Sequence, residues 1–159
     1  MKRSTKTGVG AGTMAVLLAL TSFLNGLQSA KRESCTLKVD SAHISKYAKM
    51  TDGERKLKIK ARTECNNVQK YSVISMEFYE VISGRKDVVR SFDPIMVSSD
   101  RKRPKNAYFE SFEEFCINNS EHRYYGEASG TVYMKSGKQI KVSGASEKST
   151  TLRCGIVAK

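Results

Sequence analysis

The 159-residue chain has no tryptophan, only two prolines and two histidines, and fewer acidic than basic residues, 16 against 28. The shortage of proline excludes a collagen-like chain, and a hydrophobic fraction of 39% excludes a disordered tail protein. The composition also lacks the bias of a coiled coil or of a multi-span membrane protein. A chain of this length suits one globular domain with a short appendage.

The first 30 residues have the layout of an export signal. Lys2, Arg3 and Lys6 supply positive charge, and the uncharged segment after them has an apolar part at residues 14–24 (MAVLLALTSFL). This part has the length of a signal-peptide core and is shorter than a membrane-spanning helix requires. We therefore predict a signal peptide over residues 1–30, with an uncleaved membrane anchor as the alternative.

The domain expected after cleavage, residues 31–159, remains basic. The signal carries three bases and no acid, so 25 bases and 16 acids remain, a net charge of +9. Small residues at Gly26, Ser29 and Ala30 place the cleavage between residues 27 and 31. We expect a protein that is secreted or held in the cell envelope.

Four cysteines follow the signal, and an even number in an exported domain predicts disulfides. Three pairings are possible. We expect Cys65 to pair with Cys116, because Cys65 ends an inward-facing row, and Cys35 to pair with Cys154, because these lie on the first and last strands. No cysteine or histidine pair has the spacing of metal ligands, so we expect neither a metal site nor a cofactor.

Turn dipeptides such as Asp52-Gly53 and Ser136-Gly137 separate segments rich in Val, Ile, Tyr, Phe and Thr. The predicted strands are 35–39, 56–65, 71–82, 87–92, 107–112, 123–134, 138–143 and 150–157. Residues 93–106, which hold both prolines, have no clear period. Seven to eight short strands without intervening helices predict an all-β antiparallel sandwich or barrel, of which the Ig-like β-sandwich is the commonest at this length.

The clearest strand is 56–65. Its apolar residues share one parity with Cys65, and its basic residues Lys56, Lys58, Lys60 and Arg62 share the other. A two-residue period therefore predicts an inward apolar row and an outward basic row.

The order of these features resembles small exported proteins of Gram-positive bacteria that have no assigned function. The resemblance rests on the signal, the four cysteines and the segment Tyr124-Tyr125-Gly126 leading to Ser129-Gly130-Thr131-Val132. It implies an Ig-like sandwich held by disulfides and carries no catalytic residue. The chain departs from the immunoglobulin pattern, since no tryptophan is present and Glu114 stands two residues before Cys116, where that pattern has tyrosine.

Catalytic signatures are missing from the sequence. No phosphate-binding loop, zinc-protease motif or serine-nucleophile motif occurs. His43 and His122 are candidates for the acid and base of a ribonuclease, although both lie in polar segments typical of surface histidines. Glu113 and Glu114 are adjacent, so on a strand they would point to opposite faces rather than form a hydrolytic pair.

The remaining candidate is an anion-binding surface. It comprises the basic row Lys56, Lys58, Lys60 and Arg62, the loop residues Arg101, Lys102, Arg103 and Lys105, and the tyrosines Tyr124, Tyr125 and Tyr133. The competing interpretation is that a lysine row merely keeps an edge strand unpaired. We expect a non-enzymatic binding module for an anionic cell-envelope or extracellular partner, with a secreted nuclease-like hydrolase or a secreted inhibitor or toxin as alternatives.

Overall fold

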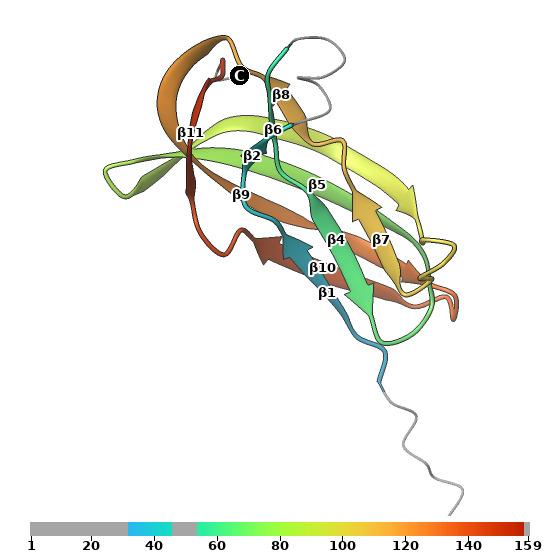
Figure 1. The fold of residues 1–159 in the computed structure, drawn as a ribbon. Helices are drawn as coiled ribbons and strands as arrows, with labels where there is room; N and C mark the ends of the chain where they lie inside the picture. The colour runs from blue at the N-terminus through green and yellow to red at the C-terminus, as the bar shows by residue number, and fades with distance from the viewer. Residues whose placement is uncertain (1–31, 46–53, 158–159) are drawn as a thin grey trace, which may run out of the picture. The chain divides into compact units, whose positions relative to one another are not determined.

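The computed structural model describes residues 32–45 and 54–157, and these are built from strands (Figure 1). The chain divides into two compact units, residues 1–32 and 33–159, and the description below concerns the second. The predicted signal peptide, residues 1–30, lies outside the described residues. In the described part, no helix is long and apolar enough to span a membrane.

The strands follow one another in the order β1 Cys35–Val39, β2 His43–Ile44, β3 Lys56–Lys58, β4 Ala61–Cys65, β5 Gln69–Ile82, β6 Arg85–Ser98, β7 Asn106–Phe109, β8 Glu113–Phe115, β9 Asn118–Met134, β10 Gln139–Ala145 and β11 Thr150–Gly155. The largest sheet has the order β10-β9-β5-β6, and β11 also pairs with β9. The other two sheets have the orders β1-β4-β7 and β2-β3-β8. Every ladder between these strands is antiparallel, so the all-β, antiparallel prediction is confirmed.

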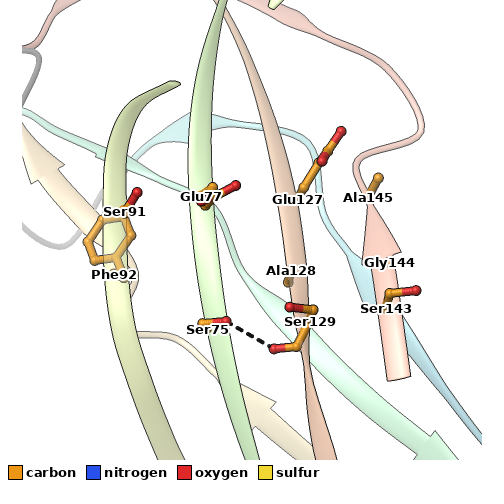
Figure 2. A pocket seen from close by; sticks show the side chains of 10 residues that line it. All are labelled: Ser75, Glu77, Ser91, Phe92, Glu127, Ala128, Ser129, Ser143, Gly144 and Ala145. Carbon is orange, nitrogen blue, oxygen red and sulfur yellow. Dashed lines mark hydrogen bonds between the residues drawn. The ribbon is translucent and has the colours of Figure 1, made fainter. Parts of the chain in front are cut away.

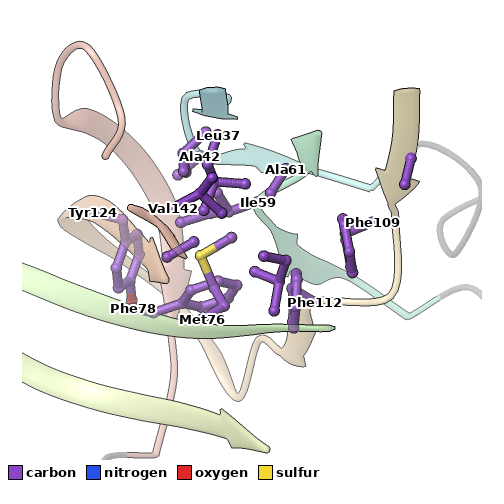
Figure 3. Close-up of a cluster of buried hydrophobic side chains, with 14 of the residues drawn as sticks. Leu37, Ala42, Ile59, Ala61, Met76, Phe78, Phe109, Phe112, Tyr124 and Val142 are labelled. Carbon is purple, nitrogen blue, oxygen red and sulfur yellow. The ribbon is translucent and has the colours of Figure 1, made fainter. Parts of the chain in front are cut away.

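The β1-β4-β7 sheet packs against the largest sheet to give a sandwich-like arrangement (Figure 1). β1 lies beside β10, and β6 lies beside β7. The core between the layers includes Met76 and Phe78 from β5, Phe109 from β7, and Ile59 and Phe112 from connecting segments (Figure 3). These five side chains are fully buried, and burying a large apolar side chain contributes about 1.5–3 kcal/mol.

The predicted strand 56–65 is two strands that belong to different sheets. β3 pairs with β2 and β8, whereas β4 pairs with β1 and β7. Between them the Ile59 amide donates to the Phe112 carbonyl and the Lys60 carbonyl accepts from the Asp40 amide. The predicted inward row is confirmed, since alternate residues from Leu57 to Thr63 are buried on both sides of the break.

The strand count was also wrong, because the described residues hold eleven strands rather than seven or eight; β2 and β8 were not predicted. Several boundaries differ as well, and β9 begins at Asn118 rather than at residue 123. β7 ends at Phe109 rather than at Phe112, which is fully buried just before β8 begins. β6 continues to Ser98 and includes Pro94, in a segment for which the sequence indicated no period. β6 is the last strand of its sheet, where a residue without an amide hydrogen is tolerated, and its register with β5 shifts beside Pro94.

The structure has two disulfides, but the expected pairing was wrong. Cys35 bonds to Cys65, and Cys116 bonds to Cys154. Cys35 and Cys65 stand directly opposite each other in the β1–β4 ladder, whereas Cys154 lies on β11 in the other sheet. Cys116 lies just before β9, where the Ile117 amide donates to the Gly155 carbonyl. The first disulfide therefore links paired strands, and the second links β11 to the segment just before its ladder partner β9. The order of strands along the chain does not specify either neighbourhood.

Candidate functional site

The predicted basic row on β3 and β4 is paired with glutamates. Lys56 Nζ lies 3.3 Å and Lys58 Nζ lies 3.8 Å from carboxylate oxygens of Glu113 on β8. Lys60 Nζ lies 3.3 Å from a Glu110 oxygen. The Lys56 and Lys58 side chains are only 17% and 15% exposed, so little of either charge faces solvent.

Arg62, the last residue of the row, has the same kind of partner. Its Nε lies 2.8 Å from Glu64 Oε1, while Lys38 Nζ lies 2.7 Å from Glu64 Oε2. The hydrogen bond from Lys38 is the main cause that lowers the pKa of the Glu64 carboxyl, and the charge of Arg62 adds to it. Every member of the row therefore contacts a glutamate. The edge-protecting interpretation was wrong, because β3 and β4 are the central strands of their sheets and are paired on both sides.

The other predicted basic segment is exposed. Arg101, Lys102, Arg103 and Lys105 lie in the loop between β6 and β7, and all four are exposed. Asp100 Oδ1 accepts hydrogen bonds from the Lys102 and Arg103 amides, each at 2.8 Å, which fixes the turn. The Arg103 guanidinium lies 5.6 Å from the centre of the Tyr108 ring.

Backbone hydrogen bonds gather three loops at this end of the sheets. The Pro104 and Lys105 carbonyls accept from the amides of Gln69 and Cys65, at 3.0 and 2.9 Å. The Lys135 amide donates to the Val68 carbonyl at 3.1 Å. The loop between β6 and β7 therefore lies next to the β4–β5 and β9–β10 connections.

This arrangement concentrates positive charge. We call the following exposed residues the basic end: Lys70, Arg101, Lys102, Arg103, Lys105, Lys135 and Lys138. Among the described residues none of the seven forms an ion pair. Lys70, Lys135 and Lys138 were not predicted, because their place beside the loop depends on how β5, β9 and β10 align.

The three candidate tyrosines occupy different environments. Tyr124 is 1% exposed and its hydroxyl donates to the Cys154 carbonyl; burial raises the pKa of its phenol to about 12. Tyr125 lies under Lys86, whose Nζ is 3.7 Å from the ring centre. Tyr133 alone of the three lies next to the basic end, where its ring stacks on Tyr71 at 4.4 Å.

The two histidines, His43 and His122, contact different residues and do not pair with each other. His43 Nδ1 lies 3.3 Å from the Ser41 carbonyl oxygen, a contact within its own loop. His122 Nδ1 lies 2.6 Å from Glu80 Oε1, and its ring stacks against the buried Tyr124. The contacts therefore give each histidine a local structural role and do not assemble the acid–base pair of a nuclease.

Glu113 and Glu114 have separate partners. Glu113 accepts from Lys56, whereas Glu114 Oε2 lies 2.8 Å from Arg90 Nε on β6. Adjacent residues of a strand point to opposite faces, which explains why these two carboxylates do not converge.

A shallow trough of about 500 Å³ crosses the outer face of the largest sheet (Figure 2). Serines from three neighbouring strands line it, Ser75, Ser129 and Ser143, beside the carboxylates of Glu77 and Glu127. Glu77 accepts a hydrogen bond from Tyr79 at 2.6 Å, which raises the pKa of the Tyr79 phenol, and Glu127 accepts one from Lys86 at 2.9 Å.

Sequence reasoning missed the facing pair Glu77 and Glu127, because only the β5–β9 register places them opposite each other. Each carboxylate is held by a donor of its own, and the Ser75 hydroxyl donates to the Ser129 carbonyl. These contacts satisfy the polar groups locally and supply no base for a serine nucleophile. In the described part of the chain, no group of three or more potential ligands is placed to hold a metal ion.

Comparisons with known proteins place the chain in no family. No protein-family model matches it, and no curated protein sequence matches it either. A structural comparison finds the solution structure of a candidate late embryogenesis abundant (LEA) protein, with 10% sequence identity, a TM-score of 0.40, and coverage of 88% of this chain and 85% of that chain. A likeness of this degree carries no argument about function.

Proposed function

We propose that this chain is an exported, non-enzymatic binding module that engages an anionic partner at the cell envelope or outside the cell. In this proposal residues 1–30 are a cleaved signal peptide and the rest is an Ig-like β-sandwich, as the resemblance to small exported Gram-positive proteins implies. The two disulfides support export, since such bonds persist in oxidising compartments.

The observation that carries the proposal is the contrast between the two basic segments. The row on β3 and β4 is compensated by Glu64, Glu110 and Glu113. The basic end gathers seven cations for which the described residues supply no ion pair. Uncompensated cations close together attract a polyanion without a shaped pocket, and the binding is fast and salt-sensitive.

The test is retention on immobilised heparin, used as a linear polyanion, at several salt concentrations. Replacing Arg101 and Lys102 by glutamate should lower the salt concentration at which the protein elutes, because each neutralised anionic group contributes about one released counterion. The matched control replaces Arg123 and Lys148 by glutamate. These residues are also exposed, and the described residues give neither an ion pair.

The two variants have the same net charge. A difference in the salt concentration at which they elute therefore reports where the replaced residues lie, and not the total charge of the protein. Arg123 stands eleven residues from Met134 along β9, about 35 Å from the basic end. Equal retention of the two variants, or retention that does not depend on salt, would refute the proposal.

One observation favours the inhibitor alternative. The loop of residues 99–105 is exposed at its centre, its turn is fixed by Asp100, and its Lys105 carbonyl accepts from the amide of the disulfide-bonded Cys65. A rigid exposed loop on a disulfide-linked frame suits insertion into a partner's cleft. The loop carries its cations in either case, so retention on heparin alone does not separate the two functions. Binding to a partner protein that persists at high salt would favour the inhibitor, whereas binding that is lost as salt rises would favour the anionic partner.

A further inference from the structure

An aromatic and apolar patch adjoins the basic end on the outer face of the largest sheet. Tyr71 on β5 and Tyr133 on β9 are opposite each other and their rings stack. In the next row Val73 is opposite Met96 of β6, which is 67% exposed and the most exposed large hydrophobic residue in the described part of the chain. We call Tyr71, Val73, Met96 and Tyr133 the apolar shoulder.

The apolar shoulder and the basic end are continuous. Lys70 precedes Tyr71, and its Nζ lies 6.0 Å from the centre of that ring. The Ser99 amide, at the start of the basic loop, donates to the Lys70 carbonyl at 3.2 Å. Cations and exposed apolar groups therefore meet along one border.

Three acids lie near the basic end and the apolar shoulder: Asp100 and Glu33 beside the seven cations, and Asp93 three residues before Met96 on β6. The seven cations still outnumber these acids. On β5 and β9 the first outward-facing acids are Glu77 and Glu127, each six residues from the tyrosine pair. Six residues of a strand span about 20 Å, well beyond the Debye length of about 8 Å at physiological salt. An anionic surface in contact with the basic end and the apolar shoulder would not feel the carboxylates of Glu77 and Glu127.

Resting on the proposed function, we propose that the anionic partner is a bilayer containing acidic phospholipids, which the domain contacts end-on. The cations of the basic end bind the headgroups, and the apolar shoulder enters the interface. A soluble polyanion would use the cations alone and would leave Met96 and the tyrosines in water. Tyrosine rings sit at the headgroup level of membranes, and lysine stems extend along apolar surface while their ammonium groups reach the headgroups.

The described chain enters the domain at the basic end, where Glu33 adds one carboxylate to the seven cations. Glu33 is held at the basic end by the Ser136 hydroxyl, which donates to Oε2 at 2.8 Å, and by Lys138 Nζ, 3.5 Å from its carbonyl oxygen.

The experiment is sedimentation with vesicles of phosphatidylcholine, with or without 30 mol% phosphatidylglycerol. The protein begins at residue 31, because the leader would bind lipid by itself; residues 33–159 form a compact unit with their own core and both disulfides. We expect binding to the anionic vesicles and none to pure phosphatidylcholine. Replacing Arg101 and Lys102 by alanine should weaken binding about 25-fold, since each cation near such a surface contributes about fivefold.

The apolar shoulder is tested with Met96→Ser combined with Tyr71→Thr. This variant should bind anionic vesicles several-fold more weakly and lose the binding that remains at high salt, while its retention on heparin stays unchanged. Val88→Ser is the matched control, because Val88 is a 46% exposed apolar residue of the same strand, eight residues from Met96. Met96→Ser alone gives a second test that leaves the stacked tyrosines intact.

Each outcome bears on the proposal. Retention on heparin without binding to phosphatidylglycerol vesicles overturns the membrane proposal and leaves the proposed function standing. Vesicle binding that Met96→Ser and the double variant do not change also overturns it, because charge alone would then explain the binding. Failure to bind either probe removes both proposals.

Discussion

Removing cysteines in pairs tests the disulfide pattern, because the structure and the alternative pairing predict opposite results. Cys35–Cys65 and Cys116–Cys154 close segments with sequence separations of 30 and 38 residues. In the chain-entropy model a closed loop of either length stabilises a protein by about 4 kcal/mol. For a domain of about 130 residues, this free energy corresponds to a change in melting temperature of about 15 °C.

The informative comparison uses two double variants that each lack two cysteines. Cys35→Ala with Cys65→Ala removes one bond and should lower the melting temperature by about 15 °C. Cys35→Ala with Cys154→Ala breaks both bonds and should lower it by about twice as much, since the two bonds lie at separate sites and their effects should add. With Cys35 bonded to Cys154, the second variant would lose one bond and the first would lose two.

The assay is thermal unfolding followed by circular dichroism, with thiols titrated in each folded variant. The first variant should have no free thiol, whereas the second should have two, at Cys65 and Cys116. A larger loss of stability in the first variant, or a non-reduced peptide that joins Cys65 to Cys116 in the unaltered protein, would refute the β1–β4 register.

Three further predictions concern single residues. Gly130→Ala should destabilise the fold by about 2 kcal/mol or more in urea unfolding, because a Cβ there would lie 2.0 Å from the Val73 carbonyl oxygen. Tyr124→Phe should cost about 1 kcal/mol through the lost hydrogen bond. Burial raises the pKa of Tyr124 from 10.0 to about 12, so the stability that this residue gives the unaltered protein is complete below pH 10 and is lost as the pH rises toward 12. The phenylalanine variant should lack this alkaline loss in pH-dependent melting. Glu113→Gln removes the acid shared by Lys56 and Lys58, so it should increase retention on heparin and lower the free energy of unfolding by about 1 kcal/mol. Unchanged retention would contradict the view that Glu113 is what keeps these two lysines from binding a polyanion.

Local patterns predicted the elements better than their partners. The strand 35–39 matches β1, and the alternation in 56–65 identified the buried row correctly. The same alternation could not locate the break at Ile59 and Lys60, because both halves keep one parity while they pair in different sheets. Alternation reports which face of a strand is buried, and it carries no information about the neighbouring strand.

The candidate site was likewise predictable only in part from local sequence. The exposed loop of residues 101–105 was identifiable from its composition, since four of its five residues are basic. The pairing of the basic row depended on Glu110 and Glu113, which follow it by about 50 residues, and on the β3–β8 ladder that brings β8 alongside. Charge along a sequence therefore locates cations, whereas the acids that compensate them are found only in the tertiary structure.

By itself the sequence determined that the domain is all-β and antiparallel, because strand period and turn residues are local properties of the chain. It also indicated that the four cysteines would form two disulfides, since their number is even. The tertiary structure decided which cysteines bond, which cations remain without acids, and that Lys70, Lys135 and Lys138 join the basic loop. These depend on register and strand order, which arise from contacts between residues far apart in the chain.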